Sequence, residues 1–216
     1  MHRALVTVAI AAACRGGEPA PTPPKPQSET TKLVVLFVID QLPEWAFEAK
    51  RPALHGGLDR LLREGEWHVG QHPSAATLTA PGHALLGTGA TTSATGILAN
   101  EWWHRELARS LKAVEDADGN VSATWLRVPA LGDAIQASHN GAKAISVSLK
   151  DRAAILPIGH AGTAVWYDHK LVGFRSTGAV AWLDAYNREH PVSAHLHDVW
   201  TPLDAALVDL LFTLWR

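Results

Sequence analysis

The 216 residues of this chain contain no internal repeat and no marked excess of charge of either sign. After the N-terminal residues, no stretch is long and apolar enough for a transmembrane helix, which needs about 20 apolar residues. The formal net charge of -2 gives no reason to expect nucleic acid or an anionic membrane surface as a partner. An apolar content of 47% is typical of a globular protein, and the length allows one domain or a piece of a larger one.

Cysteine is nearly absent, and the only one, Cys14, ends a short N-terminal segment that resembles a secretory signal. A basic start precedes the apolar stretch Ala4–Ala13, which is too short to cross a bilayer. The small residues before Cys14 also resemble a bacterial lipobox, whose cysteine becomes lipidated, although Ala11 stands where Leu is usual. The alternatives are a lipoprotein and ordinary secretion with an incidental cysteine. Both predict a periplasmic or cell-envelope protein, with a lipid at Cys14 as its only membrane contact.

The next segment, residues 15–31, is rich in proline, glycine and hydroxyl residues. Such a stretch cannot bury a core and behaves as a stiff, extended tether. We therefore expect a signal or lipobox over residues 1–14, a linker over 15–31 and a folded part over 32–216.

Hydrophobic periodicity in the folded part predicts an α/β fold, with a largely parallel sheet and helices on both faces. Continuous apolar runs predict buried strands over 33–39 and 143–149, and shorter patterns predict a possible strand over 67–71 and two strands around a turn over 165–168 and 173–176. Helices are expected over 57–65, 79–88, 129–140, 179–189 and 204–215, and residues 102–125 are expected to be irregular or a hairpin.

Two residues near the ends of these elements carry the first chemical signal. Asp40 closes the strand expected over 33–39, and the carboxyl ends of strands are where open α/β sheets bind ligands. Thr79 precedes Ala-Pro-Gly-His83, so its hydroxyl is expected at a helix N-terminus, with Pro81 at an early helical position. Free N–H groups of the first turn there would favour an alkoxide and a phosphate. The pair indicates a metal-dependent phosphoryl-transfer enzyme.

Three further residues could bind the anionic group. Lys150 and Arg152 follow the strand expected over 143–149, and Arg offers a planar fork to two phosphoryl oxygens while Lys offers a compact charge. Asn100 could donate an amide N–H to a third oxygen. Each residue alone is more often an ordinary solvated side chain, and the combination carries the interpretation.

These residues lie in runs that resemble the alkaline phosphatase superfamily, most closely the phosphate-irrepressible alkaline phosphatases with a threonine nucleophile. The matching runs are residues 38–41, 77–83, 88–89, 96–97, 100–102, 146–157 and 159–160. The resemblance extends over residues 32–216.

The resemblance implies roles for five residues. Asp40 and Thr79 would be ligands of one zinc ion, and Thr79 would be the nucleophile. Asn100, Lys150 and Arg152 would hold the non-bridging phosphoryl oxygens. The implied enzyme is a hydrolase of small phosphomonoesters that uses two zinc ions and a phosphothreonine intermediate. His83, beside the nucleophile, is expected to be structural.

The remaining zinc ligands of that family are expected in an Asp-x-x-x-His motif, an Asp-His pair and a distant histidine. No aspartate in this chain has a histidine four residues later. Asp168-His169 has the right dipeptide but lies in an expected hairpin, and His195, His197 and Asp198 resemble an exposed loop. The chain is therefore expected to be the N-terminal part of a catalytic domain, inactive by itself.

Two other functions stay open for this sequence, and a third is disfavoured. A phosphodiesterase or nucleotide pyrophosphatase of the same superfamily would share Asp40, Thr79 and Asn100, but two cations, Lys150 and Arg152, suit a dianionic monoester better than a diester. A non-catalytic, lipid-tethered fragment would explain the missing ligands. A sulfatase is disfavoured, because Cys14 is the only cysteine and no serine stands in the Cys/Ser-x-Pro-x-Arg setting.

Overall fold

A computed structural model describes residues 33–75, 77–138, 141–191, 207–208 and 210–211. The chain divides into two compact units, Met1–Pro73 and Ser74–Arg216, and each is described by itself. The segments predicted over residues 1–31 lie outside the described residues. None of the described helices is long and apolar enough to cross a membrane.

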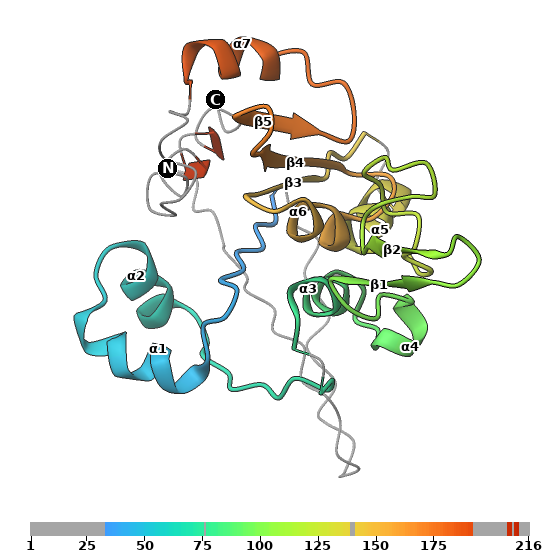
Figure 1. Cartoon of the computed structure of the whole chain (residues 1–216). Coiled ribbons are helices and arrows are strands. Elements are labelled where there is room, and N and C mark those ends of the chain that lie inside the picture. Colours follow the sequence, from blue (N-terminus) through green and yellow to red (C-terminus); the bar gives the residue numbers. More distant parts are fainter. Residues whose placement is uncertain (1–32, 76, 139–140, 192–206, 209, 212–216) are drawn as a thin grey trace. The chain divides into compact units, whose positions relative to one another are not determined.

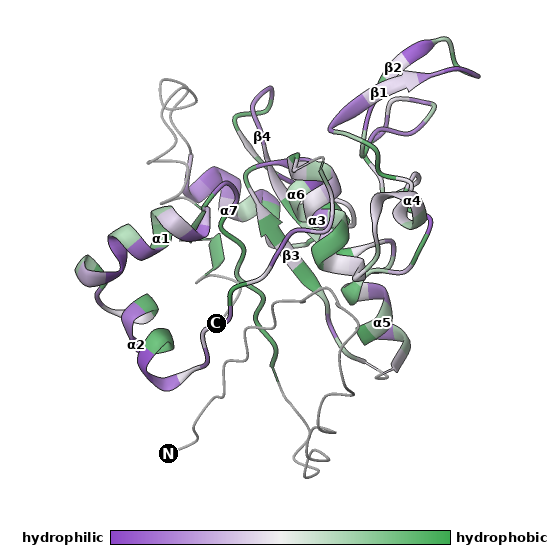
Figure 2. Ribbon diagram, turned by 90° about the horizontal axis from the view of Figure 1, so that it is seen from below, coloured by the Kyte–Doolittle hydropathy of each residue, from purple (hydrophilic) through white to green (hydrophobic). Residues whose placement is uncertain are grey.

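The first unit contains α1 (Glu44–Lys50), the short 3-10 helix η1 (Arg51–Ala53) and α2 (Gly57–Glu64). The helix predicted over 57–65 is confirmed, and it ends where the Gly65 N–H donates to the Leu61 carbonyl at 2.8 Å. Figure 2 shows that α1 and α2 each carry hydrophilic and hydrophobic residues, as expected of amphipathic helices. Helix α1 was not predicted.

The strand predicted over 33–39 is wrong for the described structure. These residues form no strand, and Val34 and Phe37 are 58% and 61% exposed. A strand exists only where its N–H and C=O groups pair with a neighbour, and an apolar sequence does not itself supply that neighbour. The possible strand at Trp67 is likewise absent, and the Trp67 ring stacks on Phe47 with centroids 4.7 Å apart.

The second unit contains a three-stranded sheet in the order β3 (Ile145–Ser148), β4 (Thr163–Asp168), β5 (Gly173–Ser176). Strands β3 and β4 are parallel, and α6 (Asp151–Ile158) connects them. Strands β4 and β5 form the antiparallel pair predicted around a turn. The α/β class is confirmed, and the described sheet has one parallel and one antiparallel pair.

Alternate residues of β4 enter two different hydrophobic clusters. Ala164 and Trp166 pack with residues of α3 (Thr79–Thr88) and α6, whereas Val165 and Tyr167 pack with residues of α7 (Leu183–Glu189). Because successive side chains of a strand point to opposite faces, helices cover both faces of the sheet, as expected.

The remaining elements of this unit are α4 (Thr92–Thr95), the hairpin strands β1 (Glu101–His104) and β2 (Arg109–Lys112), and α5 (Leu131–Ser138). The hairpin confirms one of the two alternatives considered for residues 102–125. In Figures 1 and 2, α3 and α6 lie side by side. Their contact is very close, because a Cβ added to Gly87 would lie 2.4 Å from the Pro157 Cα.

Candidate active site

Thr79 is the first residue of α3, and it is buried. It is 8% exposed, and the helix runs over the predicted residues until Gly89 adopts a left-handed conformation with φ 67°. The nitrogen Nδ1 of His83 lies 2.9 Å from the Thr79 carbonyl oxygen, and His83 is itself 7% exposed. This local contact supports the structural role expected of His83.

Asn100 lies beside this helix start, although it is distant in sequence. Its Oδ1 accepts a hydrogen bond from the Ala80 N–H at 2.8 Å. The amide NH₂ of Asn100 is its remaining polar end, and it forms no hydrogen bond within the described residues. The structure thus brings together two of the predicted site residues, Thr79 and Asn100.

This contact corrects one expectation about the helix N-terminus. Free N–H groups of the first turn were expected to attract phosphate, but Pro81 has none and the Gly82 N–H donates to the Leu78 carbonyl. The Ala80 N–H is taken by Asn100. Few backbone donors of this turn are therefore left for an anion.

Lys150 and Arg152 lie where β3 passes into α6. Lys150 is the last non-helical residue, with φ −115° and ψ 134°, and Arg152 belongs to the first helical turn. The sequence analysis placed both at the end of a strand and missed this helix. Helix α6, whose start they form, packs against α3.

The Arg152 guanidinium retains an unused donor. Its terminal NH1 lies 3.7 Å from Asp151 Oδ1, and its Nε is buried with no hydrogen-bond partner among the described residues. Asp151 Oδ1 also accepts the Arg152 backbone N–H at 2.7 Å. Buried guanidinium donors are normally paired, so this Nε is suited to an anionic ligand.

Asp40 belongs to the first unit, whereas the other four predicted site residues belong to the second. Its side chain is exposed, and Gln41 after it has a positive φ of 60°. Cys14, His195, His197 and Asp198 lie outside the described residues. Over the described ranges, no group of three or more His, Cys, Asp or Glu side chains comes together as a metal site.

Asp168, of the weakly weighted Asp168-His169 pair, has a structural role. Burial disfavours its charged form, but hydrogen bonds from the Lys170 N–H at 2.8 Å and from Arg175 at 3.1 Å outweigh this and hold the pKa below its usual value. The carboxylate therefore fixes the β4–β5 turn.

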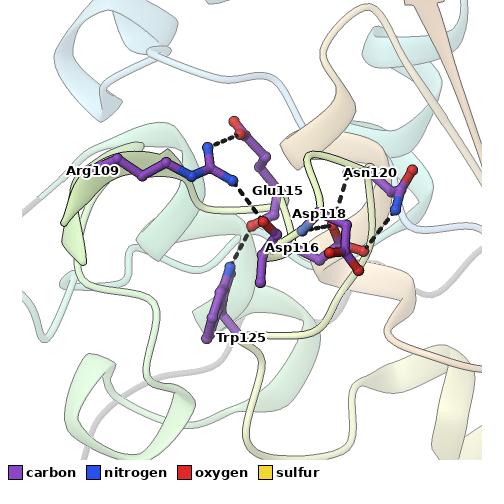
Figure 3. A network of polar contacts seen from close by, with 7 residues as sticks. Arg109, Glu115, Asp116, Asp118, Asn120 and Trp125 are labelled. Atoms are coloured by element: carbon purple, nitrogen blue, oxygen red, sulfur yellow. Dashed lines mark hydrogen bonds and ion pairs between the residues drawn. The ribbon is translucent and has the colours of Figure 1, made fainter. Parts of the chain in front are cut away.

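A second acidic segment, after β2, is also used by the fold (Figure 3). Asp116 accepts the N–H group of Asn120 at 2.8 Å, which is the main cause of its lowered pKa, and that of Asp118 at 2.9 Å. Arg109 pairs with Glu115 at 2.9 Å. This network ties the hairpin that begins next to Asn100 to the chain that follows it.

The second unit thus combines an α/β fold with a buried threonine at a helix start and the Asn100 side chain beside it. The family model described as Type I phosphodiesterase / nucleotide pyrophosphatase matches residues 34–213. The chain belongs to this family.

Several proteins similar in sequence to this chain are alkaline phosphatases. The chain is 34% identical to alkaline phosphatase PhoV of Synechococcus elongatus over 80% of this chain and 35% of that protein. It is 35% identical to PhoK of Sphingomonas over 75% and 30% of the two chains, and 31% identical to PafA of Elizabethkingia meningoseptica over 92% and 39%. The crystal structure of wild-type alkaline phosphatase PafA matches 52% of this chain and 25% of that chain, with TM-score 0.45 and 31% identity. The chain spans about a third of the length of these relatives.

Proposed function

We propose that the protein of which these residues form part hydrolyses phosphomonoesters with zinc, through a phosphothreonine intermediate at Thr79. The observation that carries the proposal is the hydrogen bond from the Ala80 N–H to Asn100 Oδ1, because it leaves the Asn100 amide as a donor next to the Thr79 helix start. The names of four relatives, which are alkaline phosphatases, support the same reaction.

In the proposed reaction, the Thr79 oxygen attacks phosphorus and the bond from phosphorus to the alcohol oxygen breaks. Water then attacks the phosphothreonine and releases phosphate and the free Thr79 hydroxyl. Asn100, Lys150 and Arg152 hold the non-bridging oxygens throughout, and the buried Nε of Arg152 provides one of the donors.

Zinc fits the donor set only in part. The Asp40 carboxylate and the Thr79 hydroxyl are both suitable oxygen ligands for zinc, but a zinc site normally has four ligands. When bound, zinc lowers the pKa of a coordinated hydroxyl and stabilises the leaving oxygen. We therefore propose that the 216 residues by themselves bind zinc poorly and are inactive. Equilibrium dialysis tests this, since tightly held, near-stoichiometric zinc together with phosphatase activity would contradict it.

A second candidate function is diester or pyrophosphate hydrolysis, which the description of the matching family model favours. Lys150 and Arg152 favour the monoester, because two cations match a dianionic phosphoryl group. A non-catalytic fragment is the remaining alternative, and zinc content separates it from an enzyme.

We also propose that the protein is exported to the periplasm or cell envelope and that Cys14 carries a lipid. A radioactive fatty acid should label the wild type and leave Cys14→Ser unlabelled. Absence of label from both proteins, with cleavage at another residue, would indicate an unlipidated secreted protein.

The decisive experiment for the reaction uses the longest product of the gene and a ³²P-labelled aryl phosphate. Acid quenching should trap label on the wild type, and Thr79→Ala should lose both the label and turnover. Thr88→Ala is a matched control, because Thr88 lies at the other end of the same helix, where its hydroxyl donates to the Ala84 carbonyl at 2.7 Å and accepts the Ala90 N–H at 3.1 Å. Label retained by Thr79→Ala would refute the assignment of the nucleophile.

A further inference from the structure

Helix α3 begins without a capping side chain of its own. The residue at the N-cap position is Leu78, which makes no side-chain cap hydrogen bond. Ala80 is fully buried, so its N–H has no access to water and needs a partner from the protein. Asn100, twenty residues later, supplies that partner at 2.8 Å.

The backbone of Asn100 is anchored independently of this contact. The Asn100 carbonyl oxygen accepts the Ala113 N–H at 2.9 Å, which joins the start of β1 to the end of β2. Three residues earlier, Ile97 is fully buried in the core. The side chain of Asn100 is thus presented to α3 from a fixed position.

We infer that Asn100 is a positioning residue for the nucleophile: its Oδ1 caps α3 at Ala80 and so fixes the turn that carries Thr79, while its NH₂ faces the phosphoryl group. Only the role of the Asn100 NH₂ toward phosphate rests on the proposed function; the capping of α3 does not. An amide is suited to both tasks because it holds an acceptor and a donor in one rigid plane. A carboxylate in its place would retain the acceptor and lose the donor.

The first test measures the cap without any activity. Amide hydrogen exchange of Ala80 is compared by NMR in the wild type, Asn100→Asp and Asn100→Ala. Asn100→Ala should speed exchange by about fivefold or more, the effect of a lost helix cap, whereas Asn100→Asp should stay close to the wild type. Amides of β4 serve as the internal reference for global folding. An unchanged Ala80 amide in a folded Asn100→Ala protein would overturn the inference.

A matched control is available in Asn187, which also clamps backbone from a distance. Its Oδ1 accepts the Phe174 N–H and its Nδ2 donates to the Phe174 carbonyl, both at 2.9 Å. Asn187→Ala should change exchange at Phe174 and leave Ala80 unchanged. A response of Ala80 to both alanine variants would mean general loosening and would also overturn the inference.

The second test uses turnover by the longest gene product. If Asn100 only donated to phosphate, Asn100→Asp would have the lower kcat, because its carboxylate also repels the substrate. If Asn100 also positions Thr79, Asn100→Ala should lose more kcat than Asn100→Asp, while KM rises in both. The opposite order of kcat refutes positioning. A wild type without esterase activity would refute the proposed function and leave the exchange result standing.

Discussion

Gly87→Ala should destabilise the protein, although the same change inside a helix usually stabilises by about 0.5–1 kcal/mol. The reason is the close contact between α3 and α6. The added Cβ would lie 2.4 Å from the Pro157 Cα and 2.8 Å from the Pro157 carbonyl oxygen. Carbon atoms normally approach to about 3.5–4.0 Å, so the two helices would have to separate by about 1 Å.

The magnitude follows from overpacking, which costs about 1–3 kcal/mol. The upper half of that range applies to Gly87, because the atoms that the methyl group would meet are backbone atoms and cannot rotate away. After subtraction of the helix-propensity gain, we expect a net loss of about 1–2 kcal/mol in the free energy of unfolding.

The assay is urea unfolding followed by tryptophan fluorescence, for which the chain offers 9 tryptophans. A loss of this size lowers the midpoint by about 0.5–1 M urea for a typical slope of about 2 kcal/mol per M. Gly178→Ala is the control in the same unit, because no atom lies within 4 Å of the added Cβ. If Gly87→Ala is as stable as Gly178→Ala or the wild type, the close packing of α3 on α6 is refuted.

Three further predictions concern other polar groups. Asp133→Asn should destabilise by about 1–3 kcal/mol, because the carboxylate accepts the Ala161 N–H at 2.7 Å among other backbone donors. Burial disfavours the charged form of Asp133, but these hydrogen bonds outweigh it and lower the pKa of the carboxyl. The stabilisation by the carboxylate should therefore be complete above about pH 4 and be lost as the pH falls through the folded-state pKa. Urea titrations of the wild type and the variant at several pH values would contradict this if the difference between their free energies of unfolding did not shrink in acid. Lys150→Ala and Arg152→Ala in the longest gene product should each reduce monoester kcat/KM by at least about tenfold, with a smaller loss on a diester, and equal losses would favour the diesterase. Tyr167→Phe should be neutral or stabilising in urea titrations, because its buried hydroxyl has no hydrogen-bond partner among the described residues, and a loss above about 1 kcal/mol would reveal a partner.

The sequence predicted the elements whose boundaries carry local signals. Helix α3 begins at Thr79 and ends before Gly89, as Pro81 and the glycine indicated. Helix α6 was missed because it has only eight residues, follows a strand almost directly and contains Pro157. The apolar run over 33–39 resembles a buried strand, but pairing depends on a distant segment and no local pattern specifies it.

The same limit applies to the candidate site. Thr79, Lys150 and Arg152 could be identified as candidate site residues from the sequence, because each lies at the start or the end of a predicted helix or strand. The contact between Asn100 and the Ala80 N–H was not, because it joins a hairpin start to a helix start and depends on the tertiary fold. No spacing rule in a sequence relates two such positions.

The helix starts also determine where charge neutralisation must come from under the proposed function. In α3 the Ala80 N–H is taken by Asn100, and in α6 the Arg152 N–H donates to the Asp151 side chain. Backbone donors that could attract an anion are therefore partly used by neighbouring side chains. A phosphoryl dianion at this site consequently depends on the side-chain cations of Lys150 and Arg152 and on bound metal. Because both cations stand at the start of the helix that packs against α3, any change that moves α6 should weaken phosphate binding without touching the substrate.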